Sequence, residues 1–167
     1  MGQAGEGLFI QANGTTLWSS VSLGAENTGS GTYRLEEGRL ETIQLHVGVD
    51  GRGAFVQTGG VHIQQSTYHP IRLASAPGSE GSYHLTGDGE LHAGTVEVGF
   101  RGVGTFEQTG GSQTLSRLEI GVEEGSRGSF EMSGGELETD HTTVGLEGEG
   151  SFHMRGGHAR LGGGRHR

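Results

Sequence analysis

The sequence lacks cysteine and lysine and contains only two prolines among its 167 residues. Without cysteine there is no disulfide framework, no thiolate nucleophile and no cysteine-based zinc site. Without lysine, Schiff-base chemistry and the lysine contact of a P-loop are excluded. Proline is too rare, and glycine too irregularly spaced, for a collagen triple helix.

Long apolar runs are also absent, and hydrophobic side chains make up only 30% of the chain. No run approaches the roughly 18 residues that a transmembrane helix requires. The formal net charge of -9 at pH 7 opposes binding to nucleic acid or to an anionic membrane. We therefore expect neither a nucleic-acid partner nor membrane insertion. Glycine is abundant, with 36 residues, a composition that would suit a disordered chain if no repeat were present.

A repeat does run through nearly the whole chain, and its first part is an aromatic residue with glycine two positions before it. The aromatic residues recur every 22 to 28 positions at Phe9, Tyr33, Phe55, Tyr83, Phe106, Phe130 and Phe152. Two residues after each of them stand Gln11, Leu35, Gln57, Leu85, Gln108, Met132 and Met154. Residues two apart in a strand point to the same side, so we expect both sets to form inward-facing ladders. The buried glutamine amides would then bond to the backbone of the glycine turns.

The second part of the repeat is an alternating apolar pair followed by glycine, as in Val21-Ser22-Leu23-Gly24 and Val96-Glu97-Val98-Gly99. The third copy has alanine, Ala74, at the glycine position. Period-two alternation predicts strands rather than helices. A third short strand is possible around Leu17, Leu40, Leu91 and Leu137.

One unit of this size exposes its apolar face unless it stacks on its neighbours. The sequence therefore predicts an all-β, single-stranded parallel β-helix (β-solenoid) that forms one domain over residues 1–167. We expect about seven coils of 22–24 residues, three faces and a right-handed winding. At about 4.8 Å per coil the rod would be roughly 34 Å long. A longer third coil, within residues 62–80, would carry a projecting loop.

The repeat resembles those of secreted bacterial β-helix proteins of the autotransporter-passenger and PEP-CTERM-associated kind. Units such as Gly53-Ala54-Phe55-Val56-Gln57-Thr58-Gly59-Gly60 and Gly81-Ser82-Tyr83-His84-Leu85-Thr86-Gly87 carry the resemblance. It implies a protein outside the cell or at the cell surface. The sequence departs from that pattern in having no signal peptide and no C-terminal anchor, so we expect a mature fragment or another export route.

The two ends of the chain predict a way of assembling. Counting from Phe152 to the chain end and on to Phe9 of a second copy gives 24 residues, which matches the internal spacing. Uncapped solenoid ends that match each other favour head-to-tail filaments. The expected assembly residues are Phe9, Phe152, Leu161, Arg165 and Arg167. A longer repeat array cut at its ends, or a capped monomer, are the alternatives.

Outward positions of the aromatic strands place four polar residues in one row, His84, Glu107, Glu131 and His153. Neighbouring carboxylates about 5 Å apart would suit a divalent cation or the acid pair of a retaining glycosidase. A solvated surface ladder is the plainer alternative. A second outward row contains His46, Arg72, Glu97, Glu119 and Thr143, and Arg72 and Glu97 form a plausible ion pair there. The third-coil loop offers Tyr68 and His69 to a glycan or another partner.

These observations favour an extracellular structural protein that assembles with copies of itself into a filament or surface layer. We expect no catalytic residues, no bound metal and no cofactor. Two other functions stay open. The chain could be a segment of an adhesin or passenger stalk that binds glycans, or a polysaccharide-active lyase or hydrolase that uses the His84–His153 row.

Overall fold

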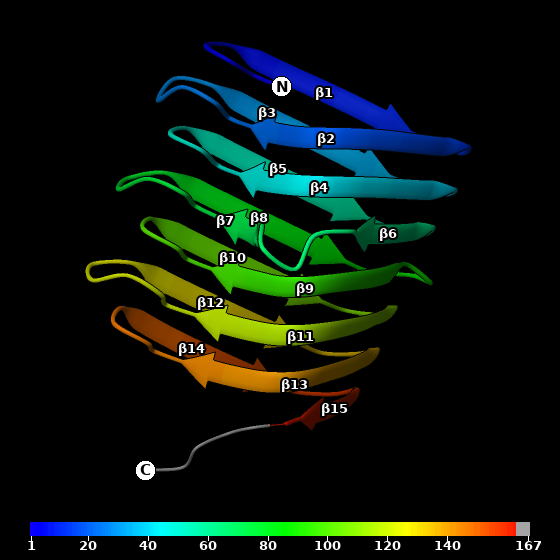
Figure 1. The fold of residues 1–167 in the computed structure, drawn as a ribbon, viewed down its shortest axis with the longest axis vertical. Helices are drawn as coiled ribbons and strands as arrows, with labels where there is room; N and C mark the ends of the chain where they lie inside the picture. Colours follow the sequence, from blue (N-terminus) through cyan, green and yellow to red (C-terminus); the bar gives the residue numbers. More distant parts are fainter. Residues whose placement is uncertain (163–167) are drawn as a thin grey trace.

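The computed structural model describes residues 1–162, and every regular element in this part of the chain is a β-strand. The strands form two parallel sheets, and the chain passes from one sheet to the other through about six turns (Figure 1). The predicted all-β parallel β-solenoid is therefore confirmed. The handedness of the winding stays a prediction.

Sheet A contains seven six-residue strands, and each residue pairs with the residue at the same position of the neighbouring strand. These strands are β1 (Glu6–Gln11), β3 (Ser30–Leu35), β5 (Arg52–Gln57), β8 (Glu80–Leu85), β10 (Val103–Gln108), β12 (Arg127–Met132) and β14 (Glu149–Met154). Their second, fourth and sixth residues face inward. The aromatic residue is always the fourth residue, so the repeat spacing determines the register.

Sheet B contains the longer strands of each turn and one interrupted strand. Its members are β2 (Thr15–Leu23), β4 (Arg39–Val47), β6 (Val61–Gln64), β7 (Ile71–Leu73), β9 (Glu90–Val98), β11 (Ser112–Ile120), β13 (Glu136–Val144) and β15 (His158–Leu161). Both β6 and β7 pair with β4 on one side and with β9 on the other. Together they therefore fill one level of the sheet.

The third strand expected in each repeat exists as the first half of a nine-residue strand. In β4 the inward side chains are Leu40 and Thr42, then Leu45 and Val47, so the alternation shifts by one residue in between. The residues at this shift, such as Ile43, are also skipped in the pairing of β4 with β2. The strand bends there without losing its ladder, so the third face is continuous with the second and forms no separate sheet.

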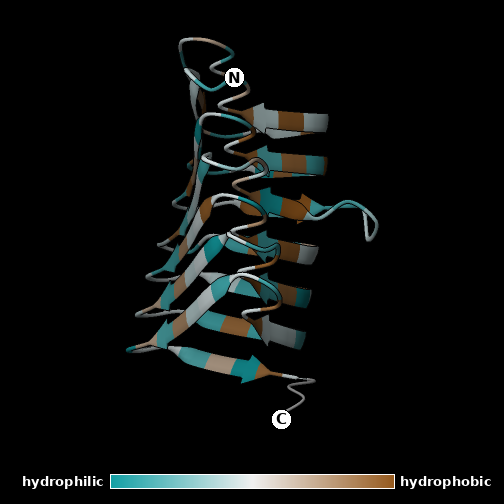
Figure 2. Cartoon of the chain, turned by 90° about the vertical axis from the view of Figure 1, so that its left-hand side faces the viewer, coloured by the Kyte–Doolittle hydropathy of each residue, from teal (hydrophilic) through white to brown (hydrophobic). Residues whose placement is uncertain are grey.

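The loop of the third turn interrupts the strand at this same bend. Six residues, 65–70, lie between β6 and β7, where β4 has only residues 43–44 between the same paired positions. The loop projects from the outer side of sheet B (Figure 2). These six residues lie within the longer third coil, residues 62–80.

Turns between the sheets use glycine where the backbone of successive levels comes close. Gly99 has a φ of +72°, which side-chain-bearing residues rarely adopt. A Cβ on Gly104 would lie 2.0 Å from the backbone nitrogen of Gly99. Ala74 adopts a φ of 63° at the position that is glycine in the other turns. Glycine thus permits the tight connections that keep the levels in register.

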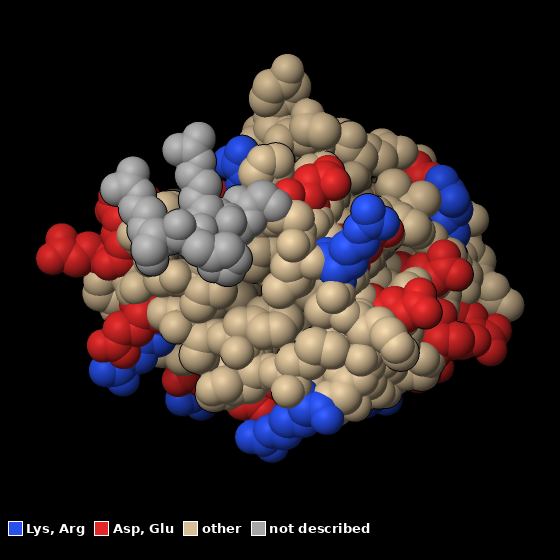
Figure 3. Space-filling model, turned by 90° about the horizontal axis from the view of Figure 1, so that it is seen from below, with Lys and Arg blue, Asp and Glu red and all other residues tan. Residues whose placement is uncertain are grey.

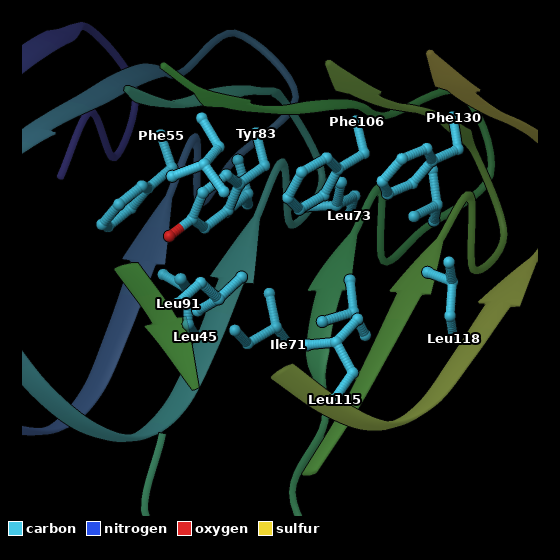
Figure 4. Packing of buried hydrophobic residues seen from close by; sticks show 14 of the residues in the cluster. Leu45, Phe55, Ile71, Leu73, Tyr83, Leu91, Phe106, Leu115, Leu118 and Phe130 are labelled. Atoms are coloured by element: carbon cyan, nitrogen blue, oxygen red, sulfur yellow. The ribbon is translucent and has the colours of Figure 1, made fainter. Parts of the chain in front are cut away.

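The core lies between the sheets and contains one row of stacked rings. Figure 4 shows Phe55, Tyr83, Phe106 and Phe130 side by side, with leucine and isoleucine side chains packed against them. Successive ring centroids from Phe9 to Phe152 lie 4.6–5.1 Å apart. Stacked pairs of this kind contribute about 0.5–1.5 kcal/mol beyond their burial. The aromatic ladder therefore stabilises the stack and opposes slippage between levels.

Candidate functional site

The glutamines of the second ladder are buried and fully hydrogen-bonded. Gln57 donates from Nε2 to the carbonyl oxygens of Gly60 and Glu90, at 3.0 and 2.9 Å. Its Oε1 accepts a 2.7 Å hydrogen bond from the hydroxyl of Tyr83. Gln11 makes the equivalent bonds, with the hydroxyl of Tyr33 as the donor to Oε1. These contacts show why a polar residue is tolerated in the ladder.

The buried side-chain oxygen of Gln108 also accepts a hydrogen bond, but from a different type of donor. The next aromatic residue along the ladder is Phe130, which has no hydroxyl to donate. Gln113 supplies the missing donor instead, with Nε2 at 2.7 Å from Oε1 of Gln108. The Gln108 amide nitrogen donates to Gly111 and Glu136 carbonyls. The side-chain oxygens of Gln11 and Gln57 thus accept a hydrogen bond from a tyrosine of the next level, whereas that of Gln108 accepts one from another glutamine.

His62 is a fully buried histidine that the sequence analysis did not single out. Its Nδ1 lies 3.0 Å from the Tyr83 hydroxyl, and its Nε2 lies 3.0 Å from Oγ1 of Thr42. Because the Tyr83 hydroxyl donates to Gln57, it accepts from Nδ1–H, and Nε2 then accepts from Thr42. Burial lowers the pKa of His62 to about 3, so the imidazole is neutral at pH 7.

The spacing within the repeat could have revealed this residue. His62 follows Phe55 by seven positions, as Leu40 follows Tyr33 and Leu137 follows Phe130. In the sheet it lies between Leu40 and Leu91, which are both buried. It also stacks on Phe55 with ring centroids 5.2 Å apart. A histidine at a leucine position of a repeat is therefore a signal for a buried, neutral imidazole.

The predicted row of His84, Glu107, Glu131 and His153 lies on the outer face of sheet A. Glu107 is paired in register with His84 on one side and Glu131 on the other, and Glu131 with His153. Nδ1 of His84 lies 3.7 Å from Oε2 of Glu107, with both side chains more than 40% exposed. The structure therefore brings the four residues together, on an open surface.

A shallow hollow of about 110 Å³ lies beside this row, with the Glu107, Glu131, His153 and Arg155 side chains at its edge. Sites for drug-sized ligands are usually about 300–1,000 Å³, so the hollow could admit an ion or the edge of a sugar ring. Among residues 1–162 no cluster of three or more His, Asp or Glu has the arrangement to hold a metal.

The second outward row forms a denser charged cluster on sheet B. Nε of Arg72 lies 2.6 Å from Oε2 of Glu97. The Arg72 guanidinium also stacks over the Phe100 ring, 3.9 Å from its centroid. Burial raises the pKa of Glu97, against the hydrogen bond and charge of Arg72. The expected ion pair is present, and Phe100, which the ladder analysis omitted, supports it.

The same cluster influences His46, which lies opposite Arg72 in the adjacent strand. Burial lowers the pKa of His46, and the charge of Arg72 lowers it further. Glu119 follows Glu97 in the row and lies 3.6 Å from Nη1 of Arg117. Thr143 ends the row. These contacts are two ion pairs, Arg72–Glu97 and Arg117–Glu119, in the part of sheet B that follows the bend of its strands.

The projecting loop is fixed at both sides of its base. Nε2 of Gln44 lies 2.9 Å from Nδ1 of His69, and Gln65 bonds to Glu41. The Ser66 hydroxyl accepts hydrogen bonds from the backbone nitrogens of Tyr68 and His69. Tyr68 is 90% exposed at the tip. His69 therefore acts in anchoring the loop, and Tyr68 is its accessible side chain.

The N-terminal end of the stack exposes apolar side chains around Phe9. Trp18 packs edge-on against Phe9, with ring centroids 6.0 Å apart. Leu17 and Leu8 are 69% and 63% exposed. Residues 1–5 continue the turn pattern, because Gly24 and Ser30 donate backbone hydrogen bonds to Met1 and Gly5. β1 and β2 are thus the last strands of their sheets at this end in the described part of the chain, and apolar side chains are exposed on both.

The C-terminal end exposes the last members of the same columns. Phe152 stacks on Phe130 and is half-buried, and Met154 and Leu161 are each 45% exposed. Met154 thus keeps its ladder register but is not enclosed, because no described strand covers it. Figure 3 views this end, where uncharged residues make up much of the surface between groups of charged side chains. Arg165 and Arg167 lie outside the described residues.

No helix in residues 1–162 is long and apolar enough to cross a membrane. Comparison with known proteins finds no matching family model, no matching curated protein and no matching solved structure.

Proposed function

We propose that this chain is a structural solenoid of the cell exterior that assembles head to tail with copies of itself. One observation carries the proposal. Phe9 and Phe152 occupy the same ladder position at opposite ends of the stack, and both are half-buried. The five rings between them are fully buried and have an aromatic neighbour on both sides. Within residues 1–162, each terminal ring has a ladder neighbour on one side only, and the next copy would supply the other.

Joining β1 of one copy to β14 of another would continue every column that crosses the boundary. Phe9 would stack on Phe152, Gln11 would cover Met154, and Trp18 would cover Leu161. The free backbone groups of the two strand edges would pair, as in other cases of strand addition. Fully burying a side chain such as leucine or methionine stabilises by about 1.5–3 kcal/mol. The contact would thus repeat the packing inside the molecule.

Complementary blocking of the two ends tests this mechanism. Phe9→Glu disables one end and Phe152→Glu disables the other, and each places a charge where a ring must stack. Small-angle X-ray scattering should show single rods for each variant alone. An equimolar mixture should give rods about twice as long, since one intact end of each kind remains. Tyr68→Glu, on the loop, is the matched control and should assemble like the parent.

Two results would contradict end joining. Long fibres from either blocked variant would show that the terminal rings are not the contact. A mixture that stays at single-rod length, while the parent elongates, would show that the two ends do not meet each other. Circular dichroism on each variant establishes that the solenoid is folded.

The projecting loop favours a second function, that of a stalk which presents a glycan-binding side chain. Tyr68 is exposed on a loop whose base is held by Gln44 and Glu41. Aromatic faces with nearby amides suit sugar rings, and a fixed loop loses little entropy on binding. Tyr68→Ala should abolish glycan-array binding while His84→Ala, on the other sheet, leaves it unchanged. Binding that survives Tyr68→Ala would reject this function.

A further inference from the structure

Among residues 1–162 no element packs on the outer face of sheet A, which presents a regular pattern of side chains. Each strand presents its first, third and fifth residues outward, so three columns run across the seven strands. The side chains of the central column are small, because from β3 onward they are only those of threonine, alanine and serine. Hollows of about 300 and 320 Å³ lie between the first column and this central column, and the first three residues of the strands line them. A second sheet could approach this face closely.

The charges of the two outer columns are arranged so that the face complements itself. In three strands the first and fifth residues are an acid and a base, namely Glu80 and His84, Arg127 and Glu131, and Glu149 and His153. In the other four strands at most one of these two positions is charged. No strand carries the same charge at both positions.

From this pattern we infer that the outer face of sheet A binds the same face of a second copy, around a twofold axis along the central column. This rotation places each strand opposite its own copy, with its direction reversed. The first residue then faces the fifth, so Arg127 faces Glu131 of the second copy. Contacts of this kind are isologous, since each pair occurs twice.

The other twofold arrangement of the two faces is electrostatically less favourable, although it pairs Arg34 with Glu131. With the axis along a strand, the order of the strands reverses and each column meets itself. Glu80, in the middle strand, would then face Glu80 of the second copy, and Glu6 would face Glu149. Like charges directly opposite each other destabilise such contacts. The charge pattern therefore selects the arrangement in which strand order is preserved.

The size of the face is sufficient for a stable dimer. Seven strands about 4.8 Å apart, with six residues of about 3.3 Å each, cover roughly 650 Å² per copy. The pair would bury roughly 1,300 Å² in total, within the range of specific interfaces. The face is also close to neutral, with five carboxylates and three guanidinium groups, although the chain has a formal net charge of -9. Mutual repulsion is thus lower here than elsewhere on the molecule.

Cysteine cross-linking tests the arrangement directly because the chain has no cysteine of its own. Ser129 lies in the central column and should face itself across the twofold axis. Ser129→Cys should give a covalent dimer with a short bismaleimide, whereas Thr114→Cys, exposed on sheet B, should not. Head-to-tail contacts place Ser129 residues roughly 34 Å apart, beyond this reagent. The result is therefore independent of end joining.

A charge exchange gives a second readout on protein without cysteine. Arg127→Glu and Glu131→Arg should each weaken the dimer at least about tenfold in sedimentation, because each brings like charges together. The double variant should restore the dissociation constant to within about threefold. The inference is overturned if Ser129→Cys cross-links no better than Thr114→Cys. It is also overturned if Ser129→Cys links only when mixed with Thr32→Cys, because Ser129 faces Thr32 when the strand order is reversed. Single exchanges that leave the dissociation constant unchanged would also overturn it.

Discussion

The hydroxyl of Tyr83 lies 3.0 Å from Nδ1 of His62, at the centre of a buried hydrogen-bond chain that runs from Thr42 to Gln57. The two residues come from different sheets and adjacent turns. The chain gives every polar atom of the imidazole a partner while the ring packs among aromatic side chains. A buried network of this kind specifies one register and one protonation state.

The first prediction is that acid destabilises the fold through His62. The folded pKa is about 3 and the ordinary value is 6.5, so below pH 6.5 the unfolded chain takes up the proton first. The free energy of unfolding therefore decreases as pH falls from about 6.5 toward 3, by up to about 1.4 kcal/mol per unit. Urea unfolding at about pH 7 and pH 4.5 should differ by about 2–3 kcal/mol from this residue alone.

His62→Leu provides the comparison, since Leu40 and Leu91 occupy the same column. The variant should lose most of this pH dependence while staying folded. An unchanged difference between the two pH values would assign the acid sensitivity to other groups and would remove His62 from this role.

The second prediction concerns the aromatic ladder. Phe106 is fully buried between Tyr83 and Phe130, so Phe106→Ala should cost about 3–5 kcal/mol through lost packing and a cavity. Phe152→Ala, at the half-buried end, should cost about half as much in dilute protein. Urea denaturation measures both losses. Equal losses, or a loss below about 1 kcal/mol for Phe106→Ala, would be inconsistent with a continuous buried ladder.

The third prediction separates backbone strain from steric contact in the turns. Gly14 and Gly121 have similar φ values, +82° and +69°. A Cβ on Gly14 would meet nothing within 4 Å, but one on Gly121 would lie 2.3 Å from the Glu149 carbonyl oxygen. Gly14→Ala should therefore cost about 1–2 kcal/mol, and Gly121→Ala clearly more. Similar melting temperatures for the two variants would contradict the close packing of successive turns.

The fourth prediction is that the projecting loop is dispensable for folding. Replacing residues 65–70 with Ile-Gln, the sequence at 43–44, should join β6 and β7 into one nine-residue strand. Both already pair in register with β4 and β9, and a shorter connection favours closure by about 1 kcal/mol. Thermal unfolding should show equal or slightly higher stability. A loss above about 3 kcal/mol would mean that the loop contributes to the core.

The sequence was most informative where the repeat is strict. Seven aromatic residues at regular spacing predict the ladder, its register and the outward row of His84 and Glu107, because alternation in a strand fixes the direction of each side chain. The bend in the long strand was less visible, since it requires only a one-residue shift in alternation. The sequence therefore suggested three short strands where two of them are continuous.

The features missed from sequence depend on contacts between turns. His62 is a polar residue at a position that is leucine in the neighbouring strands. Its partners Thr42 and Tyr83 lie 20 and 21 residues away in the sequence. Phe100 lies outside both ladders and becomes meaningful only when Arg72 is placed above it. The charge match across the face of sheet A likewise emerges only after all seven strands are aligned.

Electron microscopy of the purified chain over a concentration series tests the proposed assembly most directly. If Phe9 of one copy stacks on Phe152 of the next, fibres should lengthen with concentration and show an axial repeat near 34 Å, from seven levels at about 4.8 Å. Rods of a single subunit length at every concentration would contradict head-to-tail assembly.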